Sequence, residues 1–436
     1  MRRRNAGLLL MVSACAGQNG LLVTGQGTLA TPGPSVVADA PGTAVAPSTT
    51  EFRSPDPVTT TPPGQTPESE TPATQAPPPA RLEAIIAARE IGAWQDMPPL
   101  KHPRAFHGMF RYRGTVMAMG GDTRNQVERL DETTGQWLAR PFADPGTGWD
   151  RPPYVPADMH PLSPPVLFGP WVMLLANPLE IDGFTIDFTP HLFNPITGQM
   201  GRGPASLSSF HAHRTAVGAV SDALADHVWV AGGEATREGP IPTPATSDFP
   251  PHRRATFRSF ERVTFSTLSW QRLADLPEPV SDPAVAWRDG EVLLAGGLSW
   301  LDENGQPGVT EAGHFVVDAN VARPAARAHC WSYDTKADTW TRLPELPLAR
   351  HGARAAILGR NLWVIGGRDG SGHTVARCDV LDLDSRSWST GPTLRRARSH
   401  AAVRADEAGQ LWVTGGLDAG RRPMDTVELL RSDKQP

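Results

Sequence analysis

The chain of 436 residues is poor in cysteine and tyrosine and carries no excess of positive charge. Its three cysteines are too few for a small scaffold that is held together by disulfides. Lys and Arg number 41 against 46 Asp and Glu, which excludes a strongly basic nucleic-acid-binding protein. No apolar run reaches the ~18 residues of a membrane-spanning helix. The length is ample for one large hydrophobic core or for two ordinary domains.

Residues 1–15 have the organisation of an export signal, with three arginines, an apolar segment and then small residues. The sequence Val-Ser-Ala-Cys at 12–15 resembles a bacterial lipobox. This resemblance implies that Cys15 is lipidated and that the protein is extracytoplasmic and lipid-anchored to a bacterial membrane. Ala16 resembles the sorting pattern for the outer membrane, if the source has two membranes. The alternative is that Ala-Cys-Ala at 14–16 is an ordinary cleavage site and that the protein is secreted.

Residues 16–80 are expected to form a disordered tether. Within them, the segment 31–80 contains 13 Pro and 10 Thr and almost no aromatic residues. Such a composition buries too little apolar surface to offset the entropy of ordering the chain. The tether would hold a folded domain away from the membrane, and it could carry O-linked sugars.

Six apolar runs recur through the rest of the chain, at a spacing typical of repeat architectures. Five of them end in a Gly pair, and the one at 171–177 ends in Ala-Asn instead. A polar turn followed by Trp comes after four of the runs, and Met200 replaces the Trp in a fifth. Each unit therefore reads as four short strands joined by tight turns. The runs lie at 115–121, 171–177, 228–233, 291–297, 362–367 and 411–416.

These units resemble kelch repeats, which form the blades of β-propellers. The resemblance implies an all-β, six-bladed kelch-type β-propeller over residues 91–431, followed by a tail at 432–436. The last unit stops after 426–430 without a fourth strand or a Trp, and residues 91–100 supply a matching segment with Trp94. We therefore expect this N-terminal strand to close the last blade. A short helix is expected at 81–90.

Cys330 and Cys378 each lie ten residues before the Trp of their unit. They are therefore equivalent positions in consecutive blades, too far apart and wrongly directed for a disulfide. We expect two free, buried thiols.

Two features indicate where a binding site would lie. The long insertions 141–160, 201–212, 234–257 and 298–328 should all emerge on one face of the ring, and long loops of this kind are often functional. Arg and His residues recur where the innermost strands begin, so they should surround one mouth of the central channel. They suit an acidic sugar, a carboxylate or a phosphate. The alternative is a structural role, bonded to neighbouring loop carbonyls. The candidates are Arg104, His107, His211, His213, Arg214, Arg350, His351, Arg398 and His400.

We predict no cofactor. We also predict no metal site: the spacing of His211 and His213 suits a pair of metal ligands, but no third ligand lies near them in sequence. The catalytic motifs G-x-S-x-G and H-E-x-x-H and a phosphate loop are absent. The sequence therefore favours a monomeric binding module over an enzyme. Its partner would be an envelope protein or a glycan, bound by the long-loop face, and no nucleic acid is expected.

Two alternatives remain open. Periplasmic sialic-acid epimerases are also six-bladed kelch proteins, so a sugar epimerase or isomerase with its site at the channel mouth is the first. A carboxylate and a histidine converging in a deep pocket would favour it. The second is a purely structural role in envelope assembly.

Overall fold

The computed structural model describes most of the chain beyond residue 81. The signal and tether segments with Cys15, the candidates His211, His213 and Arg214, and the tail lie outside the described residues. Within the described part, no helix is long and apolar enough to cross a membrane. The described residues are 82–87, 89–121, 126–141, 163–175, 179–181, 184–186, 190–196, 200–204, 216–237, 253–306, 309–311, 314–318 and 320–431.

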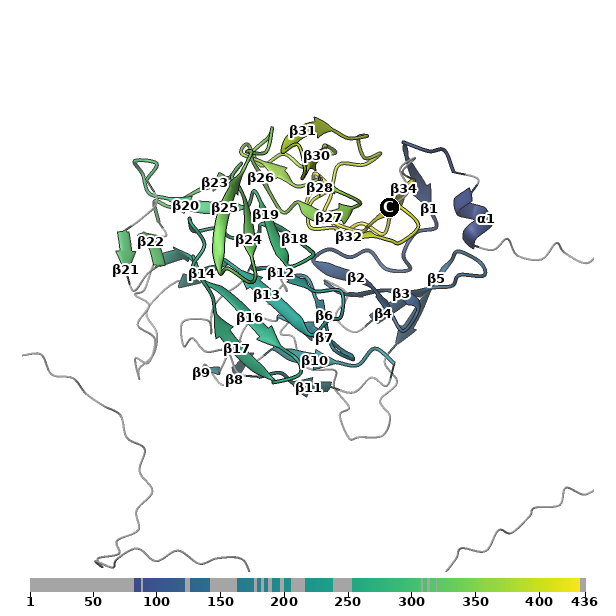
Figure 1. Ribbon diagram of the computed structural model, residues 1–436, viewed down its shortest axis with the longest axis horizontal. Coiled ribbons are helices and arrows are strands. Elements are labelled where there is room, and N and C mark those ends of the chain that lie inside the picture. Colours follow the sequence, from purple (N-terminus) through teal and green to yellow (C-terminus); the bar gives the residue numbers. More distant parts are fainter. Residues whose placement is uncertain are drawn as a thin grey trace, which may run out of the picture. The chain divides into compact units, whose positions relative to one another are not determined.

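Six four-stranded antiparallel sheets form the blades of a propeller, which confirms the predicted all-β, six-bladed fold (Figure 1). From the innermost to the outermost strand, the first blade contains β2 (His107–Tyr112), β3 (Thr115–Gly120), β4 (Gln126–Leu130) and β5 (Trp137–Pro141). The second contains β6 (Val166–Phe168), β7 (Trp171–Leu174), β10 (His191–Phe193) and β11 (Met200–Arg202). The third contains β12 (Gly218–Ser221), β13 (His227–Ala231), β16 (Phe260–Thr264) and β17 (Ser269–Arg272).

The remaining blades have the same order. The fourth contains β18 (Ala284–Arg288), β19 (Glu291–Ala295), β24 (Cys330–Asp334) and β25 (Thr339–Leu343). The fifth contains β27 (Arg354–Leu358), β28 (Asn361–Ile365), β30 (Cys378–Asp382) and β31 (Ser387–Thr390). The sixth contains β32 (Ala402–Ala405), β33 (Gln410–Thr414), β34 (Val427–Arg431) and β1 (Trp94–Met97). The apolar runs of the sequence are the second strands of the blades.

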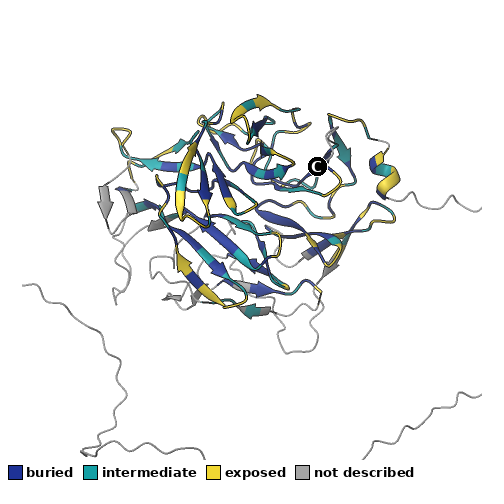
Figure 2. Ribbon diagram, in the orientation of Figure 1, coloured by how far each residue is buried: buried dark blue, intermediate teal, exposed yellow. Residues whose placement is uncertain are grey.

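Burial is generally greatest in the second strand of each blade and least in the outermost strand. The second strands, such as β13, β28 and β33, are almost entirely buried, whereas the outermost strands β17, β25 and β31 are largely exposed (Figure 2). The innermost strands contact one another in the order β2, β6, β12, β18, β27, β32 and back to β2. They therefore enclose the central channel.

The N-terminal strand β1 completes the sixth blade, as predicted. It pairs with β34 in antiparallel register, with Trp94 opposite Leu430 and Met97 opposite Val427. Trp94 is 3% exposed, and its indole Nε1 donates a hydrogen bond of 2.9 Å to the Pro392 carbonyl of the fifth blade. Helix α1 (Leu82–Ala87) precedes this strand and buries Leu82 and Ile86.

In the third to sixth blades, the tryptophan of the outermost strand ties its blade to the one before it. Trp270 donates to the Pro204 carbonyl (2.8 Å), Trp340 to Ala274 (3.0 Å) and Trp388 to Pro344 (2.9 Å). Trp94 repeats this contact at the closure. In these four blades the Trp is therefore a junction residue, with an apolar body packed in the gap and its one polar atom hydrogen-bonded.

The Gly pairs have a related role. The Gly367 N–H donates to the carbonyl of Arg398, in the following blade, over 2.9 Å. Gly366 adopts a φ of +63°, and a Cβ there would collide with that same carbonyl oxygen. A side chain would therefore force the two blades apart. The other matching hydrogen bonds run from Gly233 to Val280, Gly297 to Arg350 and Gly416 to Arg104.

The long insertions after the second strands contain further strands, which the sequence did not predict. Two of these insertions, from the third and fourth blades, together form one four-stranded sheet. We call it the accessory sheet. Its order is β14 (Glu234–Arg237), β15 (Arg253–Thr256), β22 (His314–Asp318) and β21 (Val309–Glu311). Two-stranded sheets pair β20 (Leu298–Leu301) with β23 (Arg323–Ala326), β26 (Arg350–His351) with β29 (Arg368–Asp369), and β8 (Leu179–Ile181) with β9 (Phe184–Ile186).

Cys330 and Cys378 begin the third strands of their blades and are free and fully buried, as predicted. Burial raises the pKa of each thiol to about 12, against the partial effect of nearby Arg350. Both cysteines therefore stay protonated at neutral pH and serve as small core residues.

Candidate functional site

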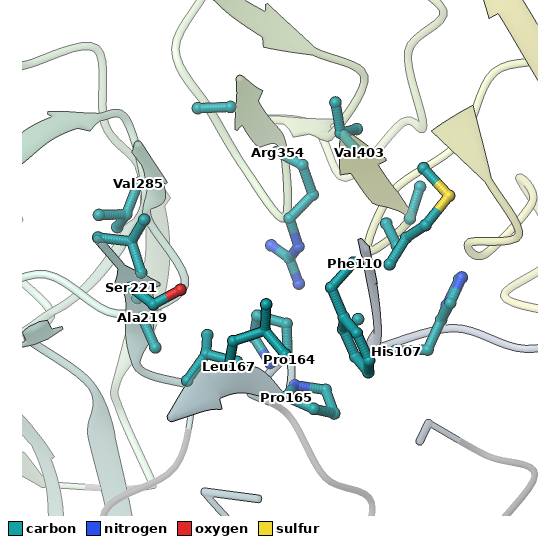
Figure 3. A pocket seen from close by; sticks show the side chains of 18 of the residues that line it. His107, Phe110, Pro164, Pro165, Leu167, Ala219, Ser221, Val285, Arg354 and Val403 are labelled. Carbon is teal, nitrogen blue, oxygen red and sulfur yellow. The ribbon is translucent and has the colours of Figure 1, made fainter. Parts of the chain in front are cut away.

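The central channel contains a cavity of about 190 Å³. All six innermost strands or the residues just before them contribute to its wall, which is mainly apolar. Phe110, Leu167, Val285 and Val403 are representative lining residues. The charged side chain in this wall is Arg354, which points into the cavity with Ala219 and Ser221 on one side and Phe110 on the other (Figure 3).

Arg354 uses only part of its hydrogen-bonding capacity. Its Nη1 donates to the Asp282 Oδ1 over 3.3 Å and to the Ala353 carbonyl over 3.0 Å. Its Nε and Nη2 are buried and have no hydrogen-bond partner within the described part of the chain. A buried donor without a partner costs more free energy than an ordinary hydrogen bond contributes. The two unpartnered nitrogens of Arg354, Nε and Nη2, therefore require an explanation.

Asp282 gathers three basic side chains at one end of this cavity. His400 Nε2 lies 2.7 Å from Asp282 Oδ2, and His351 Nδ1 lies 3.2 Å from the same oxygen. Arg354 holds the other carboxylate oxygen. Asp282, His351 and His400 precede the innermost strands of three consecutive blades, so the ring geometry brings them together.

A chain of main-chain hydrogen bonds holds these residues in place. Asp282 N–H donates to the Ala216 carbonyl, Gly352 to Asp282, His400 to Gly352 and Phe106 to His400. All five residues have positive φ, between 47° and 61°. We call this set the mouth collar. It links the third, fourth, fifth, sixth and first blades through equivalent positions.

The electrostatics of the cluster favour a neutral His400 and an ionised Asp282. Burial lowers the pKa of His400 below its usual value, which the nearby Asp282 only partly offsets. Burial would raise the pKa of the Asp282 carboxyl, but His400, His351 and Arg354 outweigh it and hold that pKa well below the usual range. At neutral pH the negative charge of Asp282 is therefore balanced by Arg354.

Within the described part of the chain, Asp282, His351 and His400 also form the group that could supply metal ligands. Their ligand atoms all lie within 4.8 Å of one another. Arg354 occupies the remaining carboxylate oxygen, and a positive charge at this position opposes a bound cation. The hydrogen bonds within the cluster satisfy the carboxylate without a metal.

The arginines predicted to surround the channel mouth have a different role. Arg104, Arg350 and Arg398 are at most 1% exposed. Their guanidinium groups pair inside their own blades with acids of the third strands, namely Glu128 (2.6 Å), Asp379 (2.6 Å) and Glu428. These pairings support the structural role that the sequence analysis held open for the three arginines. Each of their carbonyls also accepts the hydrogen bond from a Gly pair of the preceding blade.

The histidine candidates that the structure describes lie in two places. His351 and His400 join the Asp282 cluster. His107 lines the cavity wall, is fully buried, and places its Nε2 2.8 Å from the Thr414 Oγ1. His211, His213 and Arg214 lie outside the described residues.

Two residues of the site, Asp282 and Arg354, were missed by sequence reasoning. The signal for Asp282 was available, because Ser281-Asp282 and Ser399-His400 stand at the same distance before β18 and β32. An alignment of the strand starts would have placed both side chains at the same mouth. Arg354 begins β27 at a position where other blades carry small or apolar residues, which gave no comparable signal.

Comparison with known proteins agrees with this architecture. Residues 349–395, which span the fifth blade, match the kelch motif. The chain is 28% identical over 151 residues to an F-box/kelch-repeat protein of Arabidopsis thaliana, covering 34% of this chain and 35% of that protein. It is 25% identical over 216 residues to Kelch-like protein terF of Aspergillus terreus, covering 40% and 46%. It is 27% identical over 152 residues to Kelch-like protein 34 of Homo sapiens, covering 35% and 22%.

The chain thus spans less than half the length of these curated relatives. The likeness concerns the repeats, and the relatives are eukaryotic. The fifth blade matches the kelch motif, and the same order of four strands recurs in all six blades of the ring.

Proposed function

We propose that this chain is an extracytoplasmic, lipid-anchored binding module, which recognises an envelope protein with the face that carries its insertions. The accessory sheet is the observation that carries this proposal. Strands β14 and β21 lie at its two edges. The edge of a sheet presents unpaired backbone groups that can accept a strand from another protein. A glycan partner, the other candidate from the sequence, gains no comparable support.

Site-specific photocrosslinking in cells tests the binding face. A photoreactive amino acid at Val321, which is 40% exposed within the insertion of the fourth blade, should crosslink to a discrete partner. The matched control is Leu268, which is 56% exposed in the turn between β16 and β17. Because strands alternate in direction, this turn lies on the opposite face. Crosslinks at Leu268 but not at Val321 would contradict the proposed face.

The lipid anchor is a separate part of the proposal and is supported by the sequence of residues 1–16. Replacing Cys15 with Ala should release the protein from washed membranes and abolish labelling by a fatty-acid analogue. Ser13→Ala is the matched control, since it alters the same motif but keeps the cysteine. Membrane retention of the Cys15→Ala protein would contradict lipidation, and a wild-type protein in the soluble fraction would favour ordinary secretion.

An epimerase-like activity remains the second candidate, because a carboxylate and two histidines converge at the channel mouth. The size of the cavity weighs against it. At about 190 Å³ it is smaller than the roughly 300–1,000 Å³ of ordinary ligand pockets. Incubating the protein with sialic acid or a simple aldose and following anomeric exchange by NMR tests this alternative. Exchange above the buffer rate that Asp282→Asn abolishes would support it.

A further inference from the structure

We propose that Arg368 and Arg421 together bind a phosphate monoester, which is either a free small molecule or the headgroup of a lipid. The two residues lie on the loops 366–377 and 415–426, which join the second and third strands of the fifth and sixth blades. These loops emerge on the face that carries the insertions, but they contain no residue of the accessory sheet. The inference is therefore independent of the proposed protein partner.

Arg368 is held so that only the end of its side chain reaches the surface. Its backbone pairs with His351 between β26 and β29 and forms a bridge to Thr374. The residue is 9% exposed, and its Nη2 donates a hydrogen bond of 2.6 Å to the Gly372 carbonyl. Its Nε and Nη1 have no partner in the described part of the chain and keep contact with solvent. In this respect Arg368 differs from Arg354, whose unpartnered nitrogens are buried.

Arg421 lies on the neighbouring loop, in a turn with a fixed backbone. Its φ is +61°, and its N–H donates to the Asp418 carbonyl over 3.1 Å. The Thr374 Oγ1 donates to the same carbonyl over 3.3 Å and so joins this loop to the one that carries Arg368. The exposed guanidinium of Arg421 forms no hydrogen bond or ion pair with the described residues. The two joined loops thus offer two guanidinium groups to a ligand.

The charges around the two arginines favour an anion. Burial lowers the pKa of Arg368, and Arg421 lowers it further, against a smaller opposite effect of Asp369. The Asp369 Oδ1 accepts the backbone N–H groups of Ser371 and His373, each over 2.9 Å, so this carboxylate is engaged within its own turn. Two positive charges that lower one another's pKa are stabilised when an anion binds between them.

A phosphate monoester suits this pair better than a carboxylate does. It carries close to two negative charges at neutral pH and has three terminal oxygens that accept hydrogen bonds. Both guanidinium groups can therefore donate to one phosphate, in the charge-assisted bonds that arginine forms with such groups. A carboxylate has a single charge and would neutralise only one of the two arginines. Because the backbones of both loops are already fixed, binding costs little ordering of the chain.

Isothermal titration of the full chain with methyl phosphate at low ionic strength tests the site. Methyl phosphate should bind with a measurable Kd, and methyl sulfate, a monoanion of similar shape, should bind more weakly. Arg368→Gln and Arg421→Gln should each weaken binding by about tenfold, because each removes charge-assisted hydrogen bonds. The matched control is Arg386→Gln, which should bind like the wild type. Arg386 is also exposed and has a φ of +53°, but it lies in the turn between β30 and β31, on the opposite face.

A variant of the neighbouring acid keeps the test valid if the Arg368→Gln protein folds poorly. Asp369→Asn removes the negative charge but keeps an oxygen that can accept the same two backbone N–H groups. It should strengthen methyl phosphate binding by about threefold. The proposal would be overturned if the wild type did not bind methyl phosphate, or if Arg386→Gln weakened binding as much as Arg421→Gln. Unchanged binding by both the Arg421→Gln and the Asp369→Asn proteins would also overturn it.

Vesicles of phosphatidylcholine, with and without phosphatidic acid, distinguish the two sources of the phosphate. The Cys15→Ala chain is used, so that a lipid anchor cannot carry the protein to the vesicles. Sedimentation that requires phosphatidic acid and is lost in the Arg421→Gln variant would support the site with a lipid headgroup as its ligand. Binding of methyl phosphate without such sedimentation would support the site with a free monoester as its ligand.

Discussion

Gly352 allows the Asp282 cluster to form, because it leaves space that a side chain would take. A Cβ at this position would lie 2.6 Å from the His400 Cε1 and 2.7 Å from its Nε2, with φ at +61°. Gly352→Ala should therefore lower the free energy of unfolding by more than the ~1–2 kcal/mol that a left-handed backbone costs an L-residue. Gly359→Ala is the matched control, since Gly359 has a similar φ of +58° and no atom within 4 Å.

Chemical denaturation of the two variants separates the cost of the left-handed backbone from the cost of the collision with His400. Because the backbone cost is shared, the difference between the two alanine variants reports the collision with His400. Equal stabilities would show that the imidazole moves aside freely and that its contact with Asp282 contributes little.

The buried arginines make a second prediction at the scale of the residue. Arg350→Met leaves the Asp379 carboxylate without its fully buried partner and should cost about 3–5 kcal/mol of stability. The double variant Arg350→Met/Asp379→Leu should recover much of this loss, because it removes the remaining buried charge. Arg377, the other partner of Asp379, has a 37% exposed side chain and can be solvated instead. A double variant no more stable than Arg350→Met would contradict this explanation.

At the scale of the element, strand β1 carries the closure of the ring. Trp94→Ala should destabilise the propeller by about 3–5 kcal/mol, since it empties a site packed against Leu394, Leu411 and Cys378. Deleting residues 91–100 should have a larger effect, because β34 would lose its outer partner along its length. Ile91→Ala is the control, as this residue is 51% exposed. A wild-type melting temperature for the deletion would argue against closure by β1.

The blades could be predicted from sequence because their signals are local and repeated. A Gly pair marks the end of a second strand, and a Trp marks an outermost strand, whatever the rest of the fold does. Even β1 could be assigned, because Trp94 matches the residue that the last unit lacks. The accessory sheet could not, because β15 and β22 lie far apart in the sequence, in the insertions of two different blades.

The site was predicted less well, for a related physical reason. The strand pattern predicts which residues stand at the start of each innermost strand. It does not predict which neighbouring element supplies the acid that neutralises an arginine there. Arg104 and Arg398 looked free for a ligand until the third strands placed Glu128 and Glu428 beside them. His351 and His400 both contact Asp282, and this contact depends on the ring bringing three blades together.

The whole molecule should lose stability as the pH falls below neutrality. Burial lowers the folded-state pKa of His107 and His400 below the ~6.5 of an unfolded chain. The unfolded chain then binds more protons, so stability present above pH 6.5 declines toward the lower folded-state pKa values, by up to ~1.4 kcal/mol per pH unit for each histidine. Asp282, whose pKa is also lowered, adds a further loss only at much more acidic pH.

Thermal unfolding between pH 7.5 and 5.5 measures this effect. His107→Gln should flatten the dependence of the melting temperature on pH. The control is His373→Gln, because the His373 side chain is 80% exposed and should leave the slope unchanged. A wild-type protein that is equally stable across this range would contradict the argument.

The mouth collar has a consequence for how such a molecule can diversify. Its five positions are joined by main-chain hydrogen bonds, which hold whatever side chain a position carries. New side chains could therefore be introduced at the entrance one at a time, at positions that tolerate a left-handed backbone and whose side chain, unlike those of Asp282 and His400, makes no bond to another blade.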